Sequence, residues 1–329
     1  MCDQTSKKRQ KNKAFKHESL SRITIQSRSF LPVSDTLRVL LAKLTVMPRQ
    51  GRVRLFVFDD DPNPVEPFAP IQQLNLLDWL GLYPDHVYDT AENYPFMQSR
   101  RYAVYRDKFF ELYSDEYARF CFCSVSLDHA ACDSTGHGHA DCDDITPEQM
   151  QEHVKEGGKF VTRFNVARAK RRMGQATEAI NGLTDFVLIN ADRVAAPYFA
   201  HVVDAIDFGV TVDVRPADAK LDSPYEEVLF AALKANRPEE IFVPEIIFSN
   251  ARDPFEELSV DTLMEWGYLP QAIIHYLVHL LWPDVDLYPA ATLKDFAAQV
   301  ENHPITAQPI IFEEAQLQQI QQLYITSTY

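Results

Sequence analysis

A short, apolar-rich run from Val53 to Phe58 limits the folds open to this chain more than any other segment. Such a run is typical of a strand that is buried on both faces of a parallel sheet. It follows the segment Leu37 to Leu44, in which leucines recur at helical spacing and predict a helix. A helix followed by a buried strand predicts an α/β protein.

Length and charge narrow the classes of protein further. The chain has 329 residues, more than a single hydrophobic core usually holds, so two or three subdomains are expected. Its 47 acidic residues outnumber its 32 basic ones, and the formal charge of −15 disfavours general binding to nucleic acid. The longest apolar stretch, Ala272 to Trp282, is too short to span a bilayer, and no secretory signal follows the N-terminus. A soluble, cytoplasmic protein is therefore expected.

The first 20 residues carry a dense group of basic side chains without apolar periodicity, which predicts a disordered, solvated tail. Two alternatives stay open. The tail could be an arm that contacts RNA. It could also begin a presequence for the mitochondrial or another organellar matrix, since residues 19–28 are rich in Ser and Arg and poor in acidic residues.

The remaining chain divides into four parts by its patterning. Residues 21–115 read as the first half of a core domain, 116–183 as an insertion, 184–252 as the second half of that core, and 253–329 as a helical region. The second half is expected to contain strands or strand–helix patterns at 186–189, 201–206 and 210–214, and a last strand at 241–248.

Four of the five cysteines lie between residues 121 and 142, and an odd count without a secretory signal argues against a disulfide scaffold. Cys121-x-Cys123 and His139-x-x-Cys142 flank a loop, and together they supply the sulfur and nitrogen ligands that structural Zn²⁺ prefers. Cys121, Cys123, His139 and Cys142 are the expected ligands. The fourth position is shared with alternatives, namely His137, Cys132 and Asp144, and a metal-free relic is the competing interpretation.

Several short motifs follow one another in the order found in the glutamyl-tRNA synthetases and in their short homologues that glutamylate a modified tRNA base. The motifs are Trp79-Leu80-Gly81-Leu82, Gln98-Ser99-Arg100-Arg101 with Tyr105, Cys121-Phe122-Cys123, Val202-Val203-Asp204, Gly209 to Arg215, and Gly267-Tyr268-Leu269-Pro270. No single motif is specific, but their common order over residues 28–325 is. The chain therefore resembles this family.

The resemblance implies a fold class and an architecture. It predicts a class I synthetase Rossmann-type parallel sheet, an inserted acceptor-binding-like subdomain, and a C-terminal helical region like the family's stem-contact region. The matched residues do not include the family's anticodon-binding domain, as in the short homologues.

The two nucleotide loops of the family are altered at the residues that carry their chemistry. In class I enzymes the first loop holds ATP with histidines and glycine, but here Arg38 stands at the first His position, Leu40 at the Gly and Leu41 beside it. The second loop offers lysines to the departing pyrophosphate in the family. Here Arg252 is its only cation. ATP binding is therefore not expected.

The amino-acid pocket has also lost charge. Phe56 and Phe58 replace an Arg and a Glu of the family's strand, Tyr198 takes the place of an Asn, and Arg215 alone persists from the set that recognises carboxylate. Arg215 could bind a carboxylate bidentately, or it could pair with Asp204 or Asp218. Asp59 and Asp61 could chelate Mg²⁺, although a cap that ends the strand before Pro62 is the favoured interpretation. Asp204 and Tyr198 complete the candidate ligand-binding set.

These departures predict a catalytically degenerate member of the family that acts as a binding, structural or regulatory component. A protein partner or larger assembly is expected, and a tRNA acceptor stem is a second partner class because residues 168–172 are basic. Two alternatives remain: residual ATP-dependent activation through rebuilt loops, and a small-ligand sensor with an apolar pocket. His275 and His279 have the spacing of a metal-binding pair, but helix packing is the favoured interpretation for them.

Overall fold

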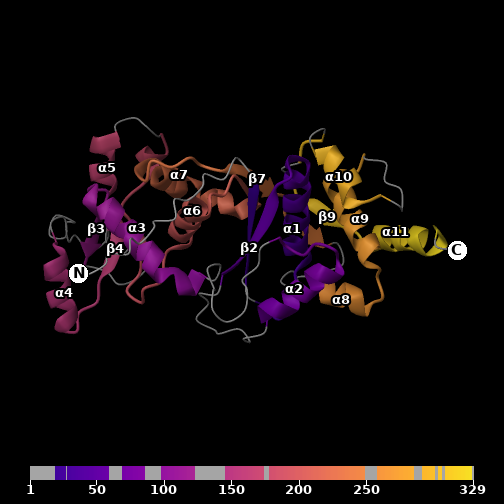
Figure 1. Ribbon diagram of the computed structural model, residues 1–329, viewed down its shortest axis with the longest axis horizontal. Helices are drawn as coiled ribbons and strands as arrows, with labels where there is room; N and C mark the ends of the chain where they lie inside the picture. Colours follow the sequence, from indigo (N-terminus) through magenta and orange to yellow (C-terminus); the bar gives the residue numbers. More distant parts are fainter. Residues whose placement is uncertain are drawn as a thin grey trace, which may run out of the picture.

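The computed structural model describes residues 19–26, 28–58, 69–85, 98–122, 145–173, 178–248, 258–284, 291–300, 303–305 and 308–327. The molecule is elongated (Figure 1), with a small antiparallel sheet near one end, a parallel sheet in the middle and a helical region at the other end. Two clusters of buried apolar side chains follow this division, one around the parallel sheet and the helical region, the other around the antiparallel sheet.

The central sheet contains β1 (Leu20–Gln26), β2 (Arg52–Phe58), β6 (Val212–Pro216) and β7 (Glu239–Val243) in the order β2-β1-β6-β7. All neighbouring strands run parallel, as predicted. Helix α1 (Val33–Val46) connects β1 to β2, and its leucines enter the core because they recur every three or four residues. The predicted helix at 37–44 and the predicted strand at 53–58 are confirmed.

Strand β1 lies within the segment that the sequence left open as part of a presequence. Residues 20–26 form an inner strand of the central sheet, paired with β2 along its whole length and with β6 near its start. The sequence obscured the strand because Arg22 interrupts its apolar pattern. Arg22 is nevertheless buried, together with Ile23 and Ile25.

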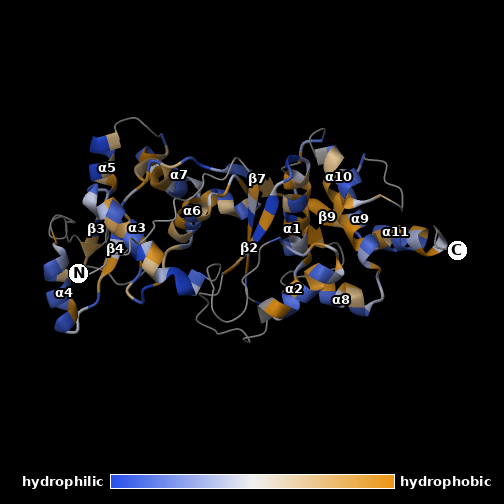
Figure 2. Cartoon of the chain, viewed as in Figure 1, coloured by the Kyte–Doolittle hydropathy of each residue, from blue (hydrophilic) through white to orange (hydrophobic). Residues whose placement is uncertain are grey.

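The second sheet is antiparallel and has the order β3-β4-β5, formed by Ala118–Cys121, Val161–Phe164 and Phe186–Ile189. Strand β5 was expected in the central sheet, but it pairs with β4 instead. Helix α3 (Tyr102–Ser114) packs aromatic residues against this sheet. Helices α4 (Pro147–Lys155) and α5 (Val166–Met173) are mostly hydrophilic and lie at its end of the molecule (Figure 2).

Residues 201–206 are not a strand. They belong to α6 (Pro197–Phe208), which has Pro at its first turn and ends at Gly209, whose φ of 66° is the left-handed conformation that glycine adopts easily. A short 3-10 helix (Ala217–Leu221) and α7 (Ser223–Ala232) follow β6 and lead to β7. Helices α6 and α7 pack on each other and belong to the same apolar cluster as the antiparallel sheet.

The expected last strand at 241–248 is divided between two sheets. Its first part is the end of β7, and its second part is β8 (Ile246–Phe248), which pairs in parallel with β9 (Ile310–Phe312). The region expected to be wholly helical therefore contains a strand, β9. Its described residues also form helices α8 (Val260–Glu265), α9 (Pro270–Leu281), α10 (Leu293–Val300) and α11 (Glu314–Ser327).

The end of helix α2 (Ala69–Trp79) lies near the start of α9, since residues of both line one pocket. The helix that contains His275 packs as expected, since His275 is buried and its Nδ1 lies 3.2 Å from the Tyr324 hydroxyl of α11. Among the residues that the structure describes, no helix has the length and apolar character needed to cross a bilayer.

Candidate functional site

The loop between β1 and α1, residues 28–32, lies in the segment that the resemblance predicts to be the first nucleotide loop. The buried side chain of Gln73 fastens it to α2 by donating from Nε2 to the carbonyl oxygen of Phe30 at 3.1 Å. On its other side, the backbone N–H of Val260 donates to the Leu31 carbonyl at 2.8 Å. The loop therefore lies against the start of α8, directly after the position of the second nucleotide loop.

The altered residues of this loop and its helix serve the protein interior. Arg38 forms an ion pair with Asp35 and donates from Nη1 to the Thr24 carbonyl of β1 at 2.9 Å. Leu40 and Leu41 are fully buried in the core. The side chain of Leu40 therefore packs inside the core. The charge of Arg38 is already used by a carboxylate of the same helix.

Arg215, at the end of β6, is bound by carboxylates of the chain itself. Its Nη1 and Nη2 donate to the two carboxylate oxygens of Glu226 in α7, at 2.5 and 2.8 Å. Nη1 also donates to Glu240 of β7 at 2.9 Å. The side chain of Glu226 is 0% exposed and that of Arg215 is 7% exposed. This is the bidentate geometry in which arginine binds carboxylates most strongly.

A second buried group continues this network across the sheet. Arg22 of β1 donates from Nη2 to Asp213 of β6 at 2.6 Å and from Nη1 to the His201 carbonyl at 2.7 Å. The His201 imidazole lies 2.7 Å from Asp213 through Nε2 and 4.0 Å from Glu226. Arg22, Arg215 and Arg237 thus face Asp213, Glu226 and Glu240, and the charges balance.

Burial and neighbouring charges shift the pKa values in this network. Burial, together with the charge of Arg22, lowers the pKa of His201 to about 3, so the imidazole is neutral at pH 7. The charges of Arg22 and the contact with His201 hold the pKa of Asp213 far below its ordinary value, against the effect of burial. Burial raises the pKa of Glu226 to about 7, while Arg215 opposes that rise.

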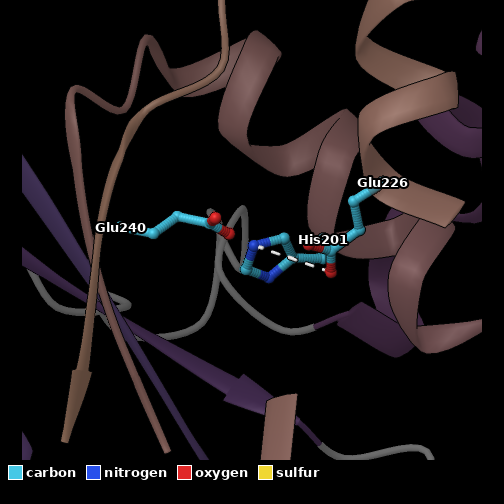
Figure 3. Close-up of side chains that lie close together, drawn as sticks. All are labelled: His201, Glu226 and Glu240. Atoms are coloured by element: carbon cyan, nitrogen blue, oxygen red, sulfur yellow. Dashed lines mark ion pairs between the residues drawn. The ribbon is translucent and has the colours of Figure 1, made fainter. Parts of the chain in front are cut away.

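His201, Glu226 and Glu240 could in principle hold a metal ion, because one ligand atom from each lies within 4.8 Å of the others. Figure 3 shows the three side chains converging from α6, α7 and β7. The guanidinium of Arg215, however, already contacts both carboxylates. A cation therefore occupies the position that a metal ion would need, and the group is an ion-pair network rather than a metal centre.

Asp204 belongs to a separate group of hydrogen bonds that joins α6 to the start of α3. It accepts hydrogen bonds from Gln98 Nε2 at 3.1 Å, Arg101 Nε at 2.7 Å and the Tyr105 hydroxyl at 3.2 Å. Burial and the nearby Asp204 carboxylate raise the pKa of Tyr105, so the hydroxyl keeps its proton and donates it. The motif Gln-Ser-x-Arg-x-x-x-Tyr thus has a structural use: its Gln, Arg and Tyr side chains all bind one buried carboxylate.

Tyr198 and Phe56 are likewise committed to packing. The Tyr198 hydroxyl donates to the Val187 carbonyl at 2.6 Å, and its ring stacks on Tyr225 at 4.9 Å. Phe56 packs edge-on against Phe208 at 5.0 Å between ring centroids. The candidate ligand-binding residues Arg215, Asp204 and Tyr198 therefore make their printed hydrogen bonds in three different contact groups. The expected partners of Arg215, Asp204 or Asp218, are replaced by Glu226 and Glu240.

Of the expected zinc ligands, Cys121 is the one within the described residues. It is buried at the end of β3, where a ligand would be held by the sheet. The remaining candidates lie outside the described residues: Cys123, His139, Cys142, Arg252, Asp59 and Asp61.

Sequence reasoning missed the partners that define the Arg215 site. Arg22 and Asp213 carried a signal, because each is a charged residue within a strand that also holds Val, Ile or Leu at neighbouring positions, a pattern that indicates a buried pair. Glu226, Glu240 and His201 carried none, since only the three-dimensional fold brings helix α6, helix α7 and strand β7 together.

Known proteins were compared with this chain at three levels. The family model described as tRNA synthetases class I (E and Q), catalytic domain, matches residues 40–319. A glutamate–tRNA ligase of Desulforamulus reducens is 27% identical over 271 residues, which are 77% of this chain and 56% of the relative. That of Clostridium tetani is 26% identical over 312 residues, 90% of this chain and 64% of the relative. The chain thus spans little more than half the length of these relatives.

Solved structures agree on the fold. A glutamate–tRNA ligase from Elizabethkingia meningosepticum, crystallised in complex with its amino acid, matches with a TM-score of 0.73 and 17% identity, covering 94% of this chain and 70% of that one. Since the family model spans most of the 329 residues, this chain belongs to the class I tRNA synthetases of the glutamate and glutamine group and carries their catalytic-domain fold.

Proposed function

We propose that this protein is a catalytically degenerate member of its family, one that does not activate glutamate and acts as a binding or structural component. The contact between Arg215 and Glu226 carries the proposal. Arg215 is the one cation that persists from the family's carboxylate-recognising set, and a buried carboxylate of the chain itself binds it bidentately. A free amino acid would have to displace Glu226 and leave that carboxylate buried without a partner, which costs several kcal/mol.

The nucleotide loops support the same proposal. Activation of an amino acid by ATP requires positive charge and close backbone approach around the triphosphate. Arg38 forms an ion pair with Asp35 of its own helix, and the buried Leu40 stands where the family is expected to have glycine. The sequence of the second loop, Ser249 to Phe255, contains one cation, Arg252, and no lysine.

Amino-acid-dependent exchange of pyrophosphate into ATP tests the proposal. The purified chain is assayed with each of the twenty amino acids, beside an active glutamate–tRNA ligase as a positive control. We expect exchange no higher than in the absence of protein. Exchange that depends on glutamate, and that Arg215→Met abolishes, would overturn the proposal in favour of residual ATP-dependent activation. Thermal stabilisation by an amino acid but not by ATP would favour the sensor alternative instead.

Contact with a tRNA acceptor stem is a second candidate function, favoured by the surface of α5. The relatives of this chain are tRNA ligases by name. Three basic residues occupy the last turn of α5, and Arg171 and Arg172 are exposed there. Arg172 is already paired with Glu116 at 2.5 Å, so Lys170 and Arg171 are the cations more available to phosphates.

Titration of binding against salt tests this second candidate. We expect Lys170→Ala with Arg171→Ala to weaken binding of a tRNA and to lower the slope of log affinity against log salt by about one per removed cation. Lys294→Ala, an exposed change on α10, is the matched control and should leave the slope unchanged. An unchanged slope in the double variant would eliminate α5 as the contact surface.

A structural zinc ion is part of the proposal for the inserted subdomain. Cys121 and Cys123 would supply one thiolate pair, and His139 with Cys142 would supply a nitrogen and a third sulfur, a donor set that suits tetrahedral Zn²⁺. The buried position of Cys121 at the end of β3 supports a structural rather than a catalytic ion, because it lies in the core of the subdomain. A protein partner remains the expected ligand of the molecule as a whole.

A further inference from the structure

A pocket of about 340 Å³ lies where the end of α2 meets the start of α9, with α10 and the last turn of α11 completing its walls. Its size is within the range of small-molecule sites. None of the residues of the Arg215 network lines it, so the two features are independent. Its lining contains the three aromatic side chains of Trp79, Phe296 and Tyr324, several aliphatic ones that include Leu80 and Ile274, and one acid, Asp78.

The aromatic side chains come from three different helices. Trp79 is the last residue of α2, Phe296 lies on α10, and Tyr324 lies on α11. The Tyr324 hydroxyl lies 3.2 Å from Nδ1 of the buried His275, a contact that orients the ring. Aromatic rings present a negative face, and a group of them around one space attracts a cation that has little affinity for water.

The charges around the pocket also favour a cation. Asp78 contributes a carboxylate, and none of the lining residues is Lys, Arg or His. Helix α2 ends beside it in a Schellman motif, in which Gly81 N donates to Asp78 O at 2.9 Å and Leu82 N to Leu77 O at 2.7 Å. The carbonyls at that end carry the negative pole of the helix.

The nearest buried histidine does not oppose this preference. Burial lowers the pKa of His275, and the neighbouring His279 lowers it further. His275 is therefore neutral at pH 7 and places no positive charge behind the Tyr324 ring. The formal charge of −15 on the whole chain also favours a cationic ligand over an anionic one.

We propose that this pocket binds an alkylated ammonium ion, with the cation against the rings of Trp79, Phe296 and Tyr324 and its charge balanced by Asp78. Quaternary and methylated ammonium groups are the ligands that such aromatic enclosures recognise. Two sources share this chemistry: a free small molecule such as choline, and a methylated lysine side chain of a partner protein. The site does not depend on the proposed loss of catalysis.

A pair of ligands of equal shape and different charge gives the sharpest test. Choline and its uncharged carbon analogue 3,3-dimethylbutan-1-ol are titrated into the full chain by calorimetry. We expect choline to bind about tenfold more tightly than the analogue, since the cation–aromatic attraction and the carboxylate act on the charge alone. Equal binding of the two, or binding of neither choline nor Nε-trimethyllysine, would overturn the proposal.

Two variants measure the contributions of the carboxylate and of the aromatic rings to binding separately. Asp78→Asn should remove most of the preference for choline over the analogue, and Trp79→Leu should weaken choline while keeping an apolar side chain in place. Asp284→Asn removes an exposed acid near the other end of α9 and should change nothing. A choline affinity that is the same in Asp78→Asn and Asp284→Asn would contradict the assignment of Asp78. Tighter binding of Nε-trimethyllysine than of choline would support the site and identify a methylated protein as its source.

Discussion

Replacement of Arg215 by methionine tests how far the buried ion pair controls stability. The variant removes the guanidinium that binds both oxygens of Glu226, whose side chain is 0% exposed and whose next basic neighbour is the neutral His201 at 4.0 Å. Removal of one partner of a buried pair costs about 3–5 kcal/mol, and we expect a loss of this size at pH 7.

The pH dependence of that loss follows from the raised pKa of Glu226. In the folded wild type this pKa is about 7, against an ordinary value of 4.5, so Glu226 makes the protein less stable as the pH rises from about 4.5 to 7 and has no further effect above. Without Arg215 the pKa rises further, and the decline continues above pH 7. The difference in unfolding free energy between wild type and variant should therefore grow by about 1.4 kcal/mol per pH unit between pH 7 and 9.

Urea unfolding followed by intrinsic fluorescence at pH 6, 7, 8 and 9 measures this difference. Arg49→Met is the matched control, because Arg49 pairs with Glu239 at the surface, with side chains 46% and 53% exposed. It should cost less than about 1 kcal/mol at every pH. Adding Glu226→Gln to Arg215→Met should remove the growth above pH 7. A loss below about 1 kcal/mol, or one that does not change with pH, would refute the reasoning.

Three further outcomes are expected. Burial lowers the pKa of His201 from 6.5 to about 3, so His201 should reduce the stability of the wild type by about 1.4 kcal/mol per pH unit as the pH falls below 6.5. Urea unfolding at pH 5 and 7 should show that His201→Asn removes this contribution. Leu40→Ala should cost about 2–5 kcal/mol by the same measurement, because the side chain is fully buried; a cost near zero would show that α1 is not packed as described. Cys121→Ser should release the bound zinc measured by metal analysis, whereas equal zinc content in wild type and variant would eliminate Cys121 as a ligand.

Much of the α/β framework could be predicted from the sequence, because periodicity is a local property. The leucines of α1 and the apolar run of β2 were sufficient to place both elements. Strand β1 was missed because Arg22 breaks its apolar pattern, and the compensating Asp213 lies 191 residues away. The segment 201–206 could be read either way by its apolar residues; the Pro197 and Gly209 that bound α6 were the better signal.

The candidate site was less predictable from the sequence, because the fold and not a local pattern brings its residues together. That Arg215 could bind a carboxylate follows from its chemistry, but which carboxylate it binds depends on the packing of α7 and β7 against β6. Glu226 and Glu240 follow Arg215 by 11 and 25 residues, and no local pattern relates the three. The same holds for Trp79, Phe296 and Tyr324, which are ordinary core aromatics in sequence and form a pocket only when α2, α10 and α11 meet.

The motifs that this chain keeps from its family differ from the altered ones in what their residues contact. Gln98, Arg101 and Tyr105 bind Asp204 and fasten α3 to α6, so their loss would destabilise the fold whether or not the protein has activity. At the positions where the family is expected to hold ATP, this chain has Arg38 and Leu40. Arg38 donates a hydrogen bond to the Thr24 carbonyl, and Leu40 packs in the core. An enzyme with rebuilt loops would need new cations pointing toward open solvent at these positions. Side chains that turn inward instead support the proposed loss of nucleotide binding.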